Sequence, residues 1–252
     1  MGNTEAPMPE LHIFATAEDV AISAAEFVAD LGLRCIRDQG RFSLALCGGS
    51  TPQGLYRRLA GNPYRNFIDW HSWHMFWGDE RCVPLDDPDS NFGMVKRILL
   101  NRITIPASQV HRMRGEIPPE EAALEYEALL RSHFLTPTPS FDLVLLGLGD
   151  DGHTASLFPE TDALEERHKL VAANWVPALQ AHRITFTLPL INGAKTVVFL
   201  DTDPDKAEVL RRVLEPTARG NPLPAGLVRP RKGNVHWFLS EEAARQLAST
   251  RS

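Results

Sequence analysis

Short runs of hydrophobic residues alternate with longer amphipathic stretches along the whole chain. The short runs are rich in β-branched and aromatic residues and predict strands in LHIFA, FSLALC, WHMFW, FDLVLLGLG, RITFTL, TVVFL and VHWFL. The amphipathic stretches predict helices over residues 16–39, after Pro52, in EEAALEYEALLRSHF, over residues 205–214 and from Ser240. Thr16, with Asp19 three residues later, indicates a capped helix start.

This alternation predicts an α/β fold with three layers, in which a Rossmann-like, mostly parallel sheet is flanked by helices on both faces. The chain has no internal repeat, low-complexity tract or long linker, so we expect one domain over residues 1–252 with a small additional lobe. Ligands of such sheets gather beyond the carboxyl ends of the strands. The residues that follow each strand are therefore the place to look for chemistry.

Composition narrows the range of partners. A formal net charge of -6 gives no overall attraction for nucleic acid or an anionic membrane, so an anionic ligand would need a local cluster of cations. Cys35, Cys47 and Cys82 are too few and too scattered for a disulfide framework or a zinc cluster. The polar N-terminus MGNTEAPMPE is not a targeting signal, and no apolar run approaches the ~20 residues of a membrane span. We expect a cytoplasmic protein.

The segment GLGDDGHTASLFP directly follows a predicted strand and matches the dinucleotide pattern G-x-G-x-x-G. Asp150 and Asp151 fill two variable positions of that pattern, where their carboxylates would repel a diphosphate. The following HTASLFP reaches Pro159 after one or two helical turns, too soon for the long helix of a dinucleotide domain. We therefore do not expect a nicotinamide or flavin cofactor.

The glycines of the same segment would instead let the backbone turn sharply, so that Asp151 and His153 project into a cleft. An imidazole can accept a proton at neutral pH, and a neighbouring carboxylate can fix its tautomer. This pattern favours proton transfer. The alternative is that Asp150 or Asp151 caps a short helix and His153 merely packs there.

A glycine turn also follows the strand FSLALC, and it leads into a helix with Pro52 plausible at its first position. Gly48 and Gly49 shape the turn, while the amides and hydroxyls of Ser50 and Thr51 would face an anion at the positive end of the helix. The segment lacks the G-K-[ST] ending of a nucleotide-binding loop, so it fits a single phosphate group better than ATP. An ordinary turn with a Ser/Thr cap is the alternative.

Two cations follow other strands. Arg183 opens RITFTL, and Lys206 lies near a predicted helix start, where the helix dipole disfavours an ammonium group. A bound anion would explain that position of Lys206. The alternative for Lys206 is a solvated charge paired with Asp203 or Asp205.

Polar residues also follow the aromatic strand WHMFW. Asp79 could hold sugar hydroxyls, and Arg81 could contact an anionic or developing-oxyanion oxygen. Asn91 is expected to start the next helix rather than to bind ligand. His71 and His74 have no carboxylate or cysteine at ligand spacing, so we expect surface or core histidines and no metal.

Together the segments CGGSTP, FWGDERCVP, GLGDDGHTASLFP and RITFTLPLIN resemble those of the 6-phosphogluconolactonases. The resemblance extends to LVRPRKGNVHWFLSEEAA and so covers nearly the whole chain. It implies hydrolysis of 6-phospho-D-glucono-1,5-lactone in the oxidative pentose phosphate pathway, on the fold shared with glucosamine-6-phosphate deaminases and ribose-5-phosphate isomerase. It also implies no metal and no organic cofactor. We expect a small phosphorylated sugar lactone as partner and a monomer or homodimer.

In this interpretation His153 is the general base and Asp151 orients it. The residues expected to bind substrate are Gly48, Gly49, Ser50, Thr51, Asp79, Arg81, Arg183 and Lys206. One departure from the family is Ser240 in place of the usual aspartate, and a serine there can still cap the final helix.

Two alternative functions stay open. A deaminase relative would need a glutamate five residues after the histidine of D-G-H, but Phe158 stands there, and a phenyl ring cannot transfer protons. A non-catalytic sugar-phosphate sensor would normally carry a helix-turn-helix segment, and ten residues ahead of LHIFA are expected to be too few for one.

Overall fold

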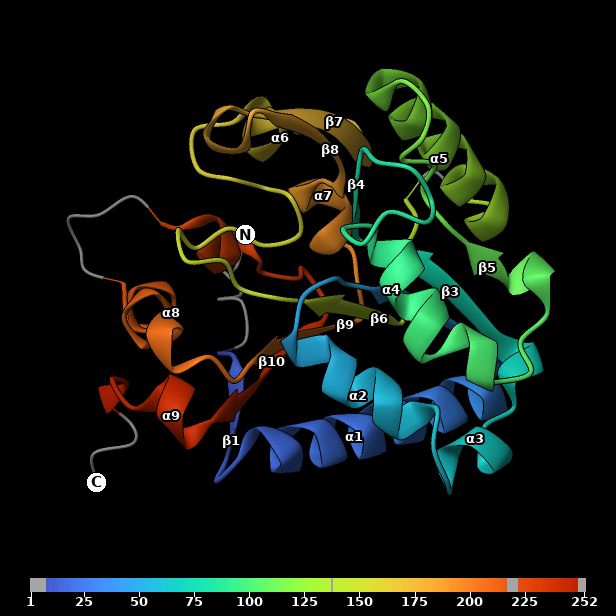
Figure 1. Cartoon of the computed structure of the whole chain (residues 1–252), viewed down its shortest axis with the longest axis horizontal. Coiled ribbons are helices and arrows are strands. Elements are labelled where there is room, and N and C mark those ends of the chain that lie inside the picture. Colours follow the sequence, from blue (N-terminus) through green and yellow to red (C-terminus); the bar gives the residue numbers. More distant parts are fainter. Residues whose placement is uncertain (1–7, 137, 217–221, 249–252) are drawn as a thin grey trace, which may run out of the picture.

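The computed structural model describes residues 8–136, 138–216 and 222–248. Its strands form two sheets, which Figure 1 shows together with the helices that cover them. The strands are β1 (Glu10–Phe14), β2 (Phe42–Leu46), β3 (Trp73–Trp77), β4 (Asp79–Arg81), β5 (Val110–His111), β6 (Leu143–Leu146), β7 (Val171–Val176), β8 (Ala181–Phe186), β9 (Thr196–Asp201) and β10 (Asn234–Ser240). The α-helices are α1 (Ala17–Gln39), α2 (Thr51–Leu59), α3 (Tyr64–Phe67), α4 (Asn91–Ile98), α5 (Pro119–Phe134), α6 (Asp162–Glu165), α7 (Leu188–Ile191), α8 (Ala207–Leu214) and α9 (Glu241–Ala244).

The larger sheet has seven strands in the order β1-β10-β9-β6-β2-β3-β5, and every neighbouring pair is parallel. The smaller sheet has the antiparallel order β4-β8-β7 and lies beside it (Figure 1). The parallel sheet predicted from the sequence is confirmed, and the smaller sheet corresponds to the expected additional lobe.

Hydrophobic side chains are buried on both faces of the larger sheet, because alternate residues of a strand point to opposite faces. In β2, Ala45 belongs to a core cluster that includes residues of α5 and α8, whereas Leu44 and Leu46 belong to a cluster that includes residues of α1, α2 and α4. The predicted three layers are confirmed. Among the described residues, no helix combines the length and apolar character that crossing a bilayer would require.

The helix starts follow local chemistry at both ends of the chain. The Thr16 hydroxyl caps α1 by accepting a hydrogen bond from the Asp19 amide at 3.1 Å. The Ser240 hydroxyl caps α9 by accepting one from the Ala243 amide at 3.2 Å, so its predicted capping role is confirmed. A capping hydroxyl satisfies an amide that has no partner within its helix.

Two predicted helix boundaries differ in the structure, and a short helix considered as an alternative is not formed. Pro52 is the second residue of α2 rather than the first. The helix expected over residues 205–214 begins as a 3₁₀ turn over Pro204–Lys206 and becomes α-helical at Ala207. The short helix considered after the histidine of GLGDDGH is wrong: Thr154 and Leu157 form an isolated antiparallel bridge, and Ala155 has φ +47°, outside the helical region.

The order of the strands identifies where a ligand can bind. From β2 the chain proceeds to β3 and β5 on one side, whereas β6, β9 and β10 lie on the other side. β2 and β6 are therefore neighbours whose connections leave in opposite directions. A crevice forms beyond the carboxyl ends of strands at such a switch point. The turns 47–50 and 147–153 follow these two strands.

Candidate active site

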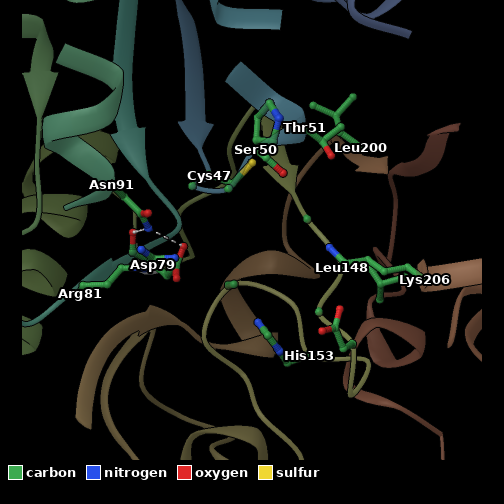
Figure 2. A pocket seen from close by; sticks show the side chains of 17 residues that line it. Cys47, Ser50, Thr51, Asp79, Arg81, Asn91, Leu148, His153, Leu200 and Lys206 are labelled. Carbon is green, nitrogen blue, oxygen red and sulfur yellow. Dashed lines mark hydrogen bonds between the residues drawn. The ribbon is translucent and has the colours of Figure 1, made fainter. Parts of the chain in front are cut away.

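A cavity of about 280 Å³ lies beyond the carboxyl ends of the central strands. Figure 2 shows Asp79, Arg81 and Asn91 on one side of it, Lys206 on the other, and His153 facing Ser50 across the gap. The lining residues are 47–52, Asp79, Arg81, Asn91, 147–150, His153, Ala155, Leu200 and Lys206. Segments far apart in the sequence therefore converge on one site.

The turn after β2 requires glycine at two positions. Gly49 has φ +101°, which residues with a side chain rarely adopt, and a Cβ at Gly48 would collide with the Asn91 side chain. The buried Tyr56 hydroxyl holds the start of the turn, since it accepts a hydrogen bond from the Cys47 amide at 3.1 Å and donates one to the Cys47 carbonyl at 2.8 Å. The backbone can thus approach a ligand closely here.

Helix α2 begins where this turn ends, so the Thr51 amide has no acceptor within the helix. Pro52 carries no N–H, and the Gln53 amide donates to the Ser50 carbonyl at 3.2 Å. The Ser50 side chain makes no capping hydrogen bond, although it occupies the cap position. The ordinary Ser/Thr cap considered for this turn is therefore absent at Ser50. Amides, a hydroxyl and the positive end of a helix dipole together form a cradle for an anion.

The turn after β6 is closed by hydrogen bonds between its own residues. The Gly149 amide donates to the His153 carbonyl at 2.9 Å, the Gly152 amide donates to the Gly149 carbonyl at 2.9 Å, and the Thr154 hydroxyl donates to the Gly147 carbonyl at 2.9 Å. Gly152 has φ +83°. A Cβ at Gly149 would collide with the His153 ring, so glycine is needed for the imidazole to lie where it does.

His153 forms a pair with Asp151. Its Nδ1 lies 2.6 Å from Asp151 Oδ1, which also accepts a hydrogen bond from the His153 amide at 3.0 Å. A carboxylate can only accept, so Nδ1 of the neutral ring carries the proton and Nε2 has a free lone pair. The imidazole stacks on Phe158 with ring centroids 4.0 Å apart, and its side chain is 28% exposed at the cavity. This arrangement can accept a proton from a bound molecule.

Asp79 is a buried carboxylate with fixed partners. Its Oδ2 accepts a hydrogen bond from the Ser156 hydroxyl at 2.7 Å, and its Oδ1 and backbone carbonyl accept from the Asn91 amide group at 3.2 and 3.0 Å. Asn91 starts α4, as predicted, and its side chain also lines the cavity, which the sequence interpretation missed. The Asp79–Asn91 pair fixes polar groups on one wall of the cavity.

Arg81 and Arg183 oppose each other in the register of strands β4 and β8. Burial lowers the pKa of Arg183, and the neighbouring Arg81 guanidinium lowers it further. Arg81 donates a hydrogen bond to the Asp89 carbonyl at 2.7 Å, and Arg183 donates one to the His182 carbonyl at 3.0 Å. Neither guanidinium forms an ion pair with a carboxylate among the residues that the structure describes. An anion between two such guanidiniums would offset their repulsion.

Lys206 lies at the cavity and forms no ion pair in the part of the chain that the structure describes. The alternative of pairing with Asp203 or Asp205 is therefore wrong; the Asp203 side chain instead accepts from the Asp205 amide at 3.0 Å. Thr51 and Thr202 hydroxyls lie 3.3 Å apart and connect the anion cradle to the end of β9. Among the described residues, Lys206 beside that cradle has no ion-pair partner within 4 Å, and its charge opposes the burial that raises the pKa of the Asp201 carboxyl.

The structure brings most of the predicted site residues together. Those that line the cavity are Gly48, Gly49, Ser50, Thr51, Asp79, Arg81, His153 and Lys206. Asp151 and Arg183 do not line the cavity themselves. Asp151 is hydrogen-bonded to His153, and Arg183 lies beside Arg81, so each is next to a residue that does. The sequence interpretation missed Asn91 and Leu148 as cavity-lining residues. Leu148 could have been found, because it lies in the same glycine turn as His153. Asn91 could not, because its place at the cavity follows from its hydrogen bond to Asp79 in the folded chain.

Comparison with known proteins agrees with this architecture. The family described as "Glucosamine-6-phosphate isomerases/6-phosphogluconolactonase" matches residues 15–237. The chain is 42% identical to human 6-phosphogluconolactonase over 247 residues, covering 96% of this chain and 95% of the human protein. It is 39% identical to 6-phosphogluconolactonase of Haemophilus influenzae over 204 residues, covering 81% and 87% of the two chains.

A solved structure is also similar over almost the full length. The 6-phosphogluconolactonase from Trypanosoma cruzi superposes with a TM-score of 0.87 at 28% identity, covering 98% of this chain and 100% of that one. The family match spans most of the chain, and the relatives are similar across both sheets and the cavity between them. The chain belongs to the family of glucosamine-6-phosphate isomerases and 6-phosphogluconolactonases.

Proposed function

We propose that the protein hydrolyses 6-phospho-D-glucono-1,5-lactone to 6-phosphogluconate, the second step of the oxidative pentose phosphate pathway. The observation that carries this proposal is the cavity itself, in which the Asp151–His153 pair lies across from an anion cradle at Ser50 and an unpaired Lys206. One end can perform proton transfer while the other holds a phosphate group. The names of the relatives, 6-phosphogluconolactonase, support the choice of lactone.

In the proposed reaction, Nε2 of His153 accepts a proton from water while the water oxygen bonds to the lactone carbonyl carbon. The bond between that carbon and the ring oxygen then breaks, and the imidazolium gives the proton to the departing oxygen. Asp151 keeps Nδ1 protonated and stabilises the positive charge that forms on the ring. Arg81 would stabilise the oxyanion of the tetrahedral intermediate.

The 6-phosphate would be held by the amides and hydroxyls of Ser50 and Thr51 and by Lys206. Arg183 lies beside Arg81 in the strand register and would act there with Arg81. Charge-assisted hydrogen bonds of this kind are stronger than neutral ones. They act far from the reacting carbonyl, so their binding energy positions the lactone against His153 rather than changing its chemistry.

Phe158 favours lactone hydrolysis over deamination of an amino sugar. It occupies the position where a deaminase relative would carry a glutamate, and its ring packs face to face against the His153 imidazole. The face of the imidazole that would meet such a carboxylate is therefore covered by hydrocarbon, which cannot relay a proton.

We also propose a cytoplasmic location, because the three cysteines are free, as is usual for proteins of a reducing compartment. Burial raises the pKa of the Cys47 thiol to about 12, which makes this thiol unreactive.

The test is an assay of purified protein with phosphorylated and unphosphorylated glucono-1,5-lactone, each corrected for spontaneous opening. We expect kcat/KM to be at least about tenfold higher for the phosphorylated lactone, because one charge-assisted hydrogen bond contributes roughly 1.5–3 kcal/mol. Equal rates for the two lactones would contradict the phosphate site. Ammonia release from glucosamine 6-phosphate would indicate a deaminase, and tight binding of 6-phosphogluconate without hydrolysis would indicate a sensor.

A further inference from the structure

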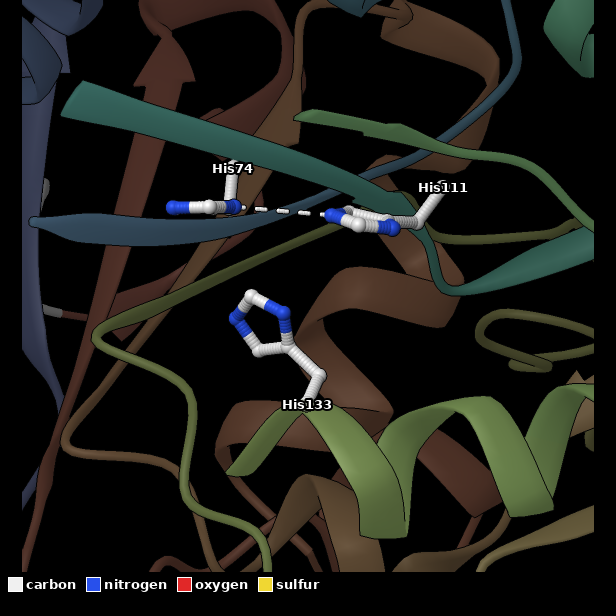
Figure 3. Close-up of side chains that lie close together, drawn as sticks. All are labelled: His74, His111 and His133. Atoms are coloured by element: carbon white, nitrogen blue, oxygen red, sulfur yellow. Dashed lines mark hydrogen bonds between the residues drawn. The ribbon is translucent and has the colours of Figure 1, made fainter. Parts of the chain in front are cut away.

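Three histidines lie close together where β3, β5 and α5 meet. His74 lies near the start of β3, His111 ends the edge strand β5, and His133 lies in the last turn of α5. Figure 3 shows the His74 and His111 rings side by side, with the His133 ring reaching toward them from the helix. None of the three lines the catalytic cavity. We call His74, His111 and His133 the histidine cluster.

The spacing of the histidine cluster suits a single metal ion. One nitrogen from each ring can be chosen so that all three lie within 4.8 Å of one another. His74 Nδ1 and His111 Nε2 are 3.5 Å apart. Two nitrogens bound to one tetrahedral zinc ion lie roughly 3.3 Å apart, because each is roughly 2.0–2.1 Å from the metal. The first pair thus needs almost no movement, and the His133 ring, with a nitrogen within 4.8 Å of the other two, would have to move closer.

The polar atoms of the histidine cluster are poorly satisfied without a ligand. Nε2 of His133 is buried and has no hydrogen-bond partner among the described residues. The 3.5 Å contact between His74 and His111 is at the long limit of a hydrogen bond. Buried polar nitrogens normally have partners, so an unpaired one calls for an explanation such as an absent ion.

The imidazoles of the histidine cluster are also in the form that binds metals. Burial, and to a smaller extent the neighbouring histidines, lower the pKa of His111 and of His133 to about 4. Burial lowers the pKa of His74 as well, with the Arg41 guanidinium adding to the effect. The rings are therefore neutral near pH 7, and a neutral imidazole offers a lone pair.

We propose that His74, His111 and His133 bind one divalent transition-metal ion of the zinc type, with water as a fourth ligand. Three imidazoles and an open position suit zinc better than calcium or magnesium, which prefer oxygen ligands. This proposal departs from the sequence interpretation, which expected no metal because His71 and His74 have no carboxylate or cysteine at ligand spacing. The two partners of His74 are 37 and 59 residues further along the chain and meet it only in the fold.

A second group of possible ligands does not have the same features. Glu10, His12 and His236 are close together, but His236 Nδ1 lies 3.2 Å from His12 Nε2 and 3.4 Å from a Glu10 carboxylate oxygen. These side chains already satisfy one another. We therefore assign the metal to the histidine cluster.

A metal in the histidine cluster would connect the edge of the larger sheet to α5. β5 has only two residues and pairs with β3 alone, so its backbone hydrogen bonds hold it weakly. A bond from His111 through the metal to His133 would fasten this short strand to the helix end. The proposed effect is therefore on stability and not on the lactone chemistry.

The test is zinc binding to the full-length protein after removal of metals, measured by competition with a chromogenic chelator. We expect one zinc ion to bind at the histidine cluster. His111→Asn or His133→Asn should lower the zinc affinity at least about tenfold, since loss of a residue that only hydrogen-bonds to a metal ligand already lowers affinity roughly 10–100-fold. His71→Asn is the matched control, because His71 is exposed and lies outside the cluster, and it should bind zinc like the wild type.

Two further measurements do not depend on activity. Cobalt(II) should give the intense visible absorption of a tetrahedral site, and His133→Asn should abolish it. Zinc at about 100 times its dissociation constant should raise Tm by about 5–10 °C in the wild type but not in His133→Asn. Circular dichroism of metal-free His133→Asn checks that the variant folds.

Zinc affinity unchanged in a His111→Asn/His133→Asn double variant would overturn the proposal. So would a zinc ion that is lost only in His236→Asn or only in His153→Ala, because it would belong to another site. Lactonase activity of the metal-free protein equal to that of the loaded protein is expected, so failure of this proposal leaves the proposed hydrolysis unaffected.

Discussion

At the scale of single residues, the His153 ring is held from two sides. Asp151 fixes the protonated edge and Phe158 covers one face. The remaining edge carries Nε2, and His153 is one of the residues that line the cavity. A side chain with one fixed tautomer and one open nitrogen can act as a base without first reorienting, which is the advantage of preorganisation.

Asp151→Asn tests this pairing. The amide can still accept from Nδ1, but it carries no charge to stabilise the imidazolium, so we expect kcat to fall by less than the roughly 10²–10⁴-fold typical for loss of a base. KM should change little, since Asp151 does not line the cavity. Steady-state kinetics of Asp151→Asn beside the exposed control Asp162→Asn provide the measurement. An unchanged kcat in Asp151→Asn would contradict the pairing.

Lys206→Ala tests the phosphate site. Removal of one charge-assisted hydrogen bond should lower kcat/KM for the phosphorylated lactone by about 10- to 100-fold, because such a bond contributes roughly 1.5–3 kcal/mol. Turnover of the unphosphorylated lactone should not change. Lys96→Ala is the control, since Lys96 is exposed on α4 outside the cavity. Equal losses with both lactones would mean that Lys206 does not contact phosphate.

At the scale of elements, the turn after β6 shows how backbone geometry positions a base. Gly147 and Gly149 are two residues apart in the same turn, yet their surroundings differ. No atom lies within 4 Å of a Cβ built at Gly147, whereas a Cβ at Gly149 would collide with the His153 ring. The chain thus contains a matched pair of positions for one experiment.

Gly149→Ala should displace the imidazole and lower kcat by roughly 10²-fold, because a shift of about 1 Å in a catalytic group has an effect of that order. Gly147→Ala should leave the His153 ring in place and so lose less activity than Gly149→Ala, although its methyl group would enter the cavity. Thermal unfolding of both variants checks that the turn still folds. Equal activity of Gly149→Ala and Gly147→Ala would show that the ring position is not constrained by this glycine.

Elements with strong local signals were predictable from the sequence, and elements defined by distant partners were not. The strand–glycine–hydroxyl pattern at Ser50 and the capped start of α1 depend on neighbours in sequence. The three-residue β4 was not predicted, because Asp79–Arg81 becomes a strand only by pairing with β8. The turn after His153 was considered as a helix because Ala155, with φ +47°, gives no composition signal of its left-handed backbone.

At the scale of the whole molecule, Asp142 connects the central strands. This buried carboxylate accepts hydrogen bonds from the Ser43 amide at 2.8 Å and hydroxyl at 2.7 Å in β2, from Lys195 at 2.7 Å and from Gln39 at 2.8 Å. Burial alone would raise its pKa, but the hydrogen bonds from Lys195 and Ser43 outweigh burial and hold the pKa below its usual value.

A lowered pKa in the folded state means that ionised Asp142 stabilises the fold above the unfolded value of about 3.9. This stabilisation is lost as the pH falls through the folded pKa. Asp142→Ala should therefore lower the unfolding free energy at pH 7 by about 1–3 kcal/mol, the cost of leaving the buried Ser43 donors without an acceptor. The Lys195 side chain is 55% exposed, so water can solvate its charge in the variant. The decrease of the unfolding free energy at acid pH should become flatter.

Denaturant unfolding between pH 7 and pH 3 measures this effect. Asp38→Ala is the control, because Asp38 pairs with Arg37 on the surface with both side chains more than half exposed, and it should change stability by less than about 1 kcal/mol. An Asp142→Ala variant as stable as Asp38→Ala would contradict the structural role of Asp142.

The site as a whole was predictable only in part. The turns at Ser50 and His153 could be assigned to one cavity because both follow strands of one parallel sheet. The opposition of Arg81 and Arg183, the contact of Asn91 with Asp79 and the histidine cluster depend on which strands and helices become neighbours. No spacing in the sequence expresses those contacts.

The central claim is that His153 is the base that opens the lactone. The most direct measurement is kcat of His153→Ala with 6-phospho-D-glucono-1,5-lactone, corrected for spontaneous opening, beside His168→Ala, an exposed histidine outside the cavity. We predict a loss of roughly 10²–10⁴-fold in His153→Ala, with 6-phosphogluconate still bound and His168→Ala like the wild type. Turnover of His153→Ala close to that of the wild type would contradict the claim.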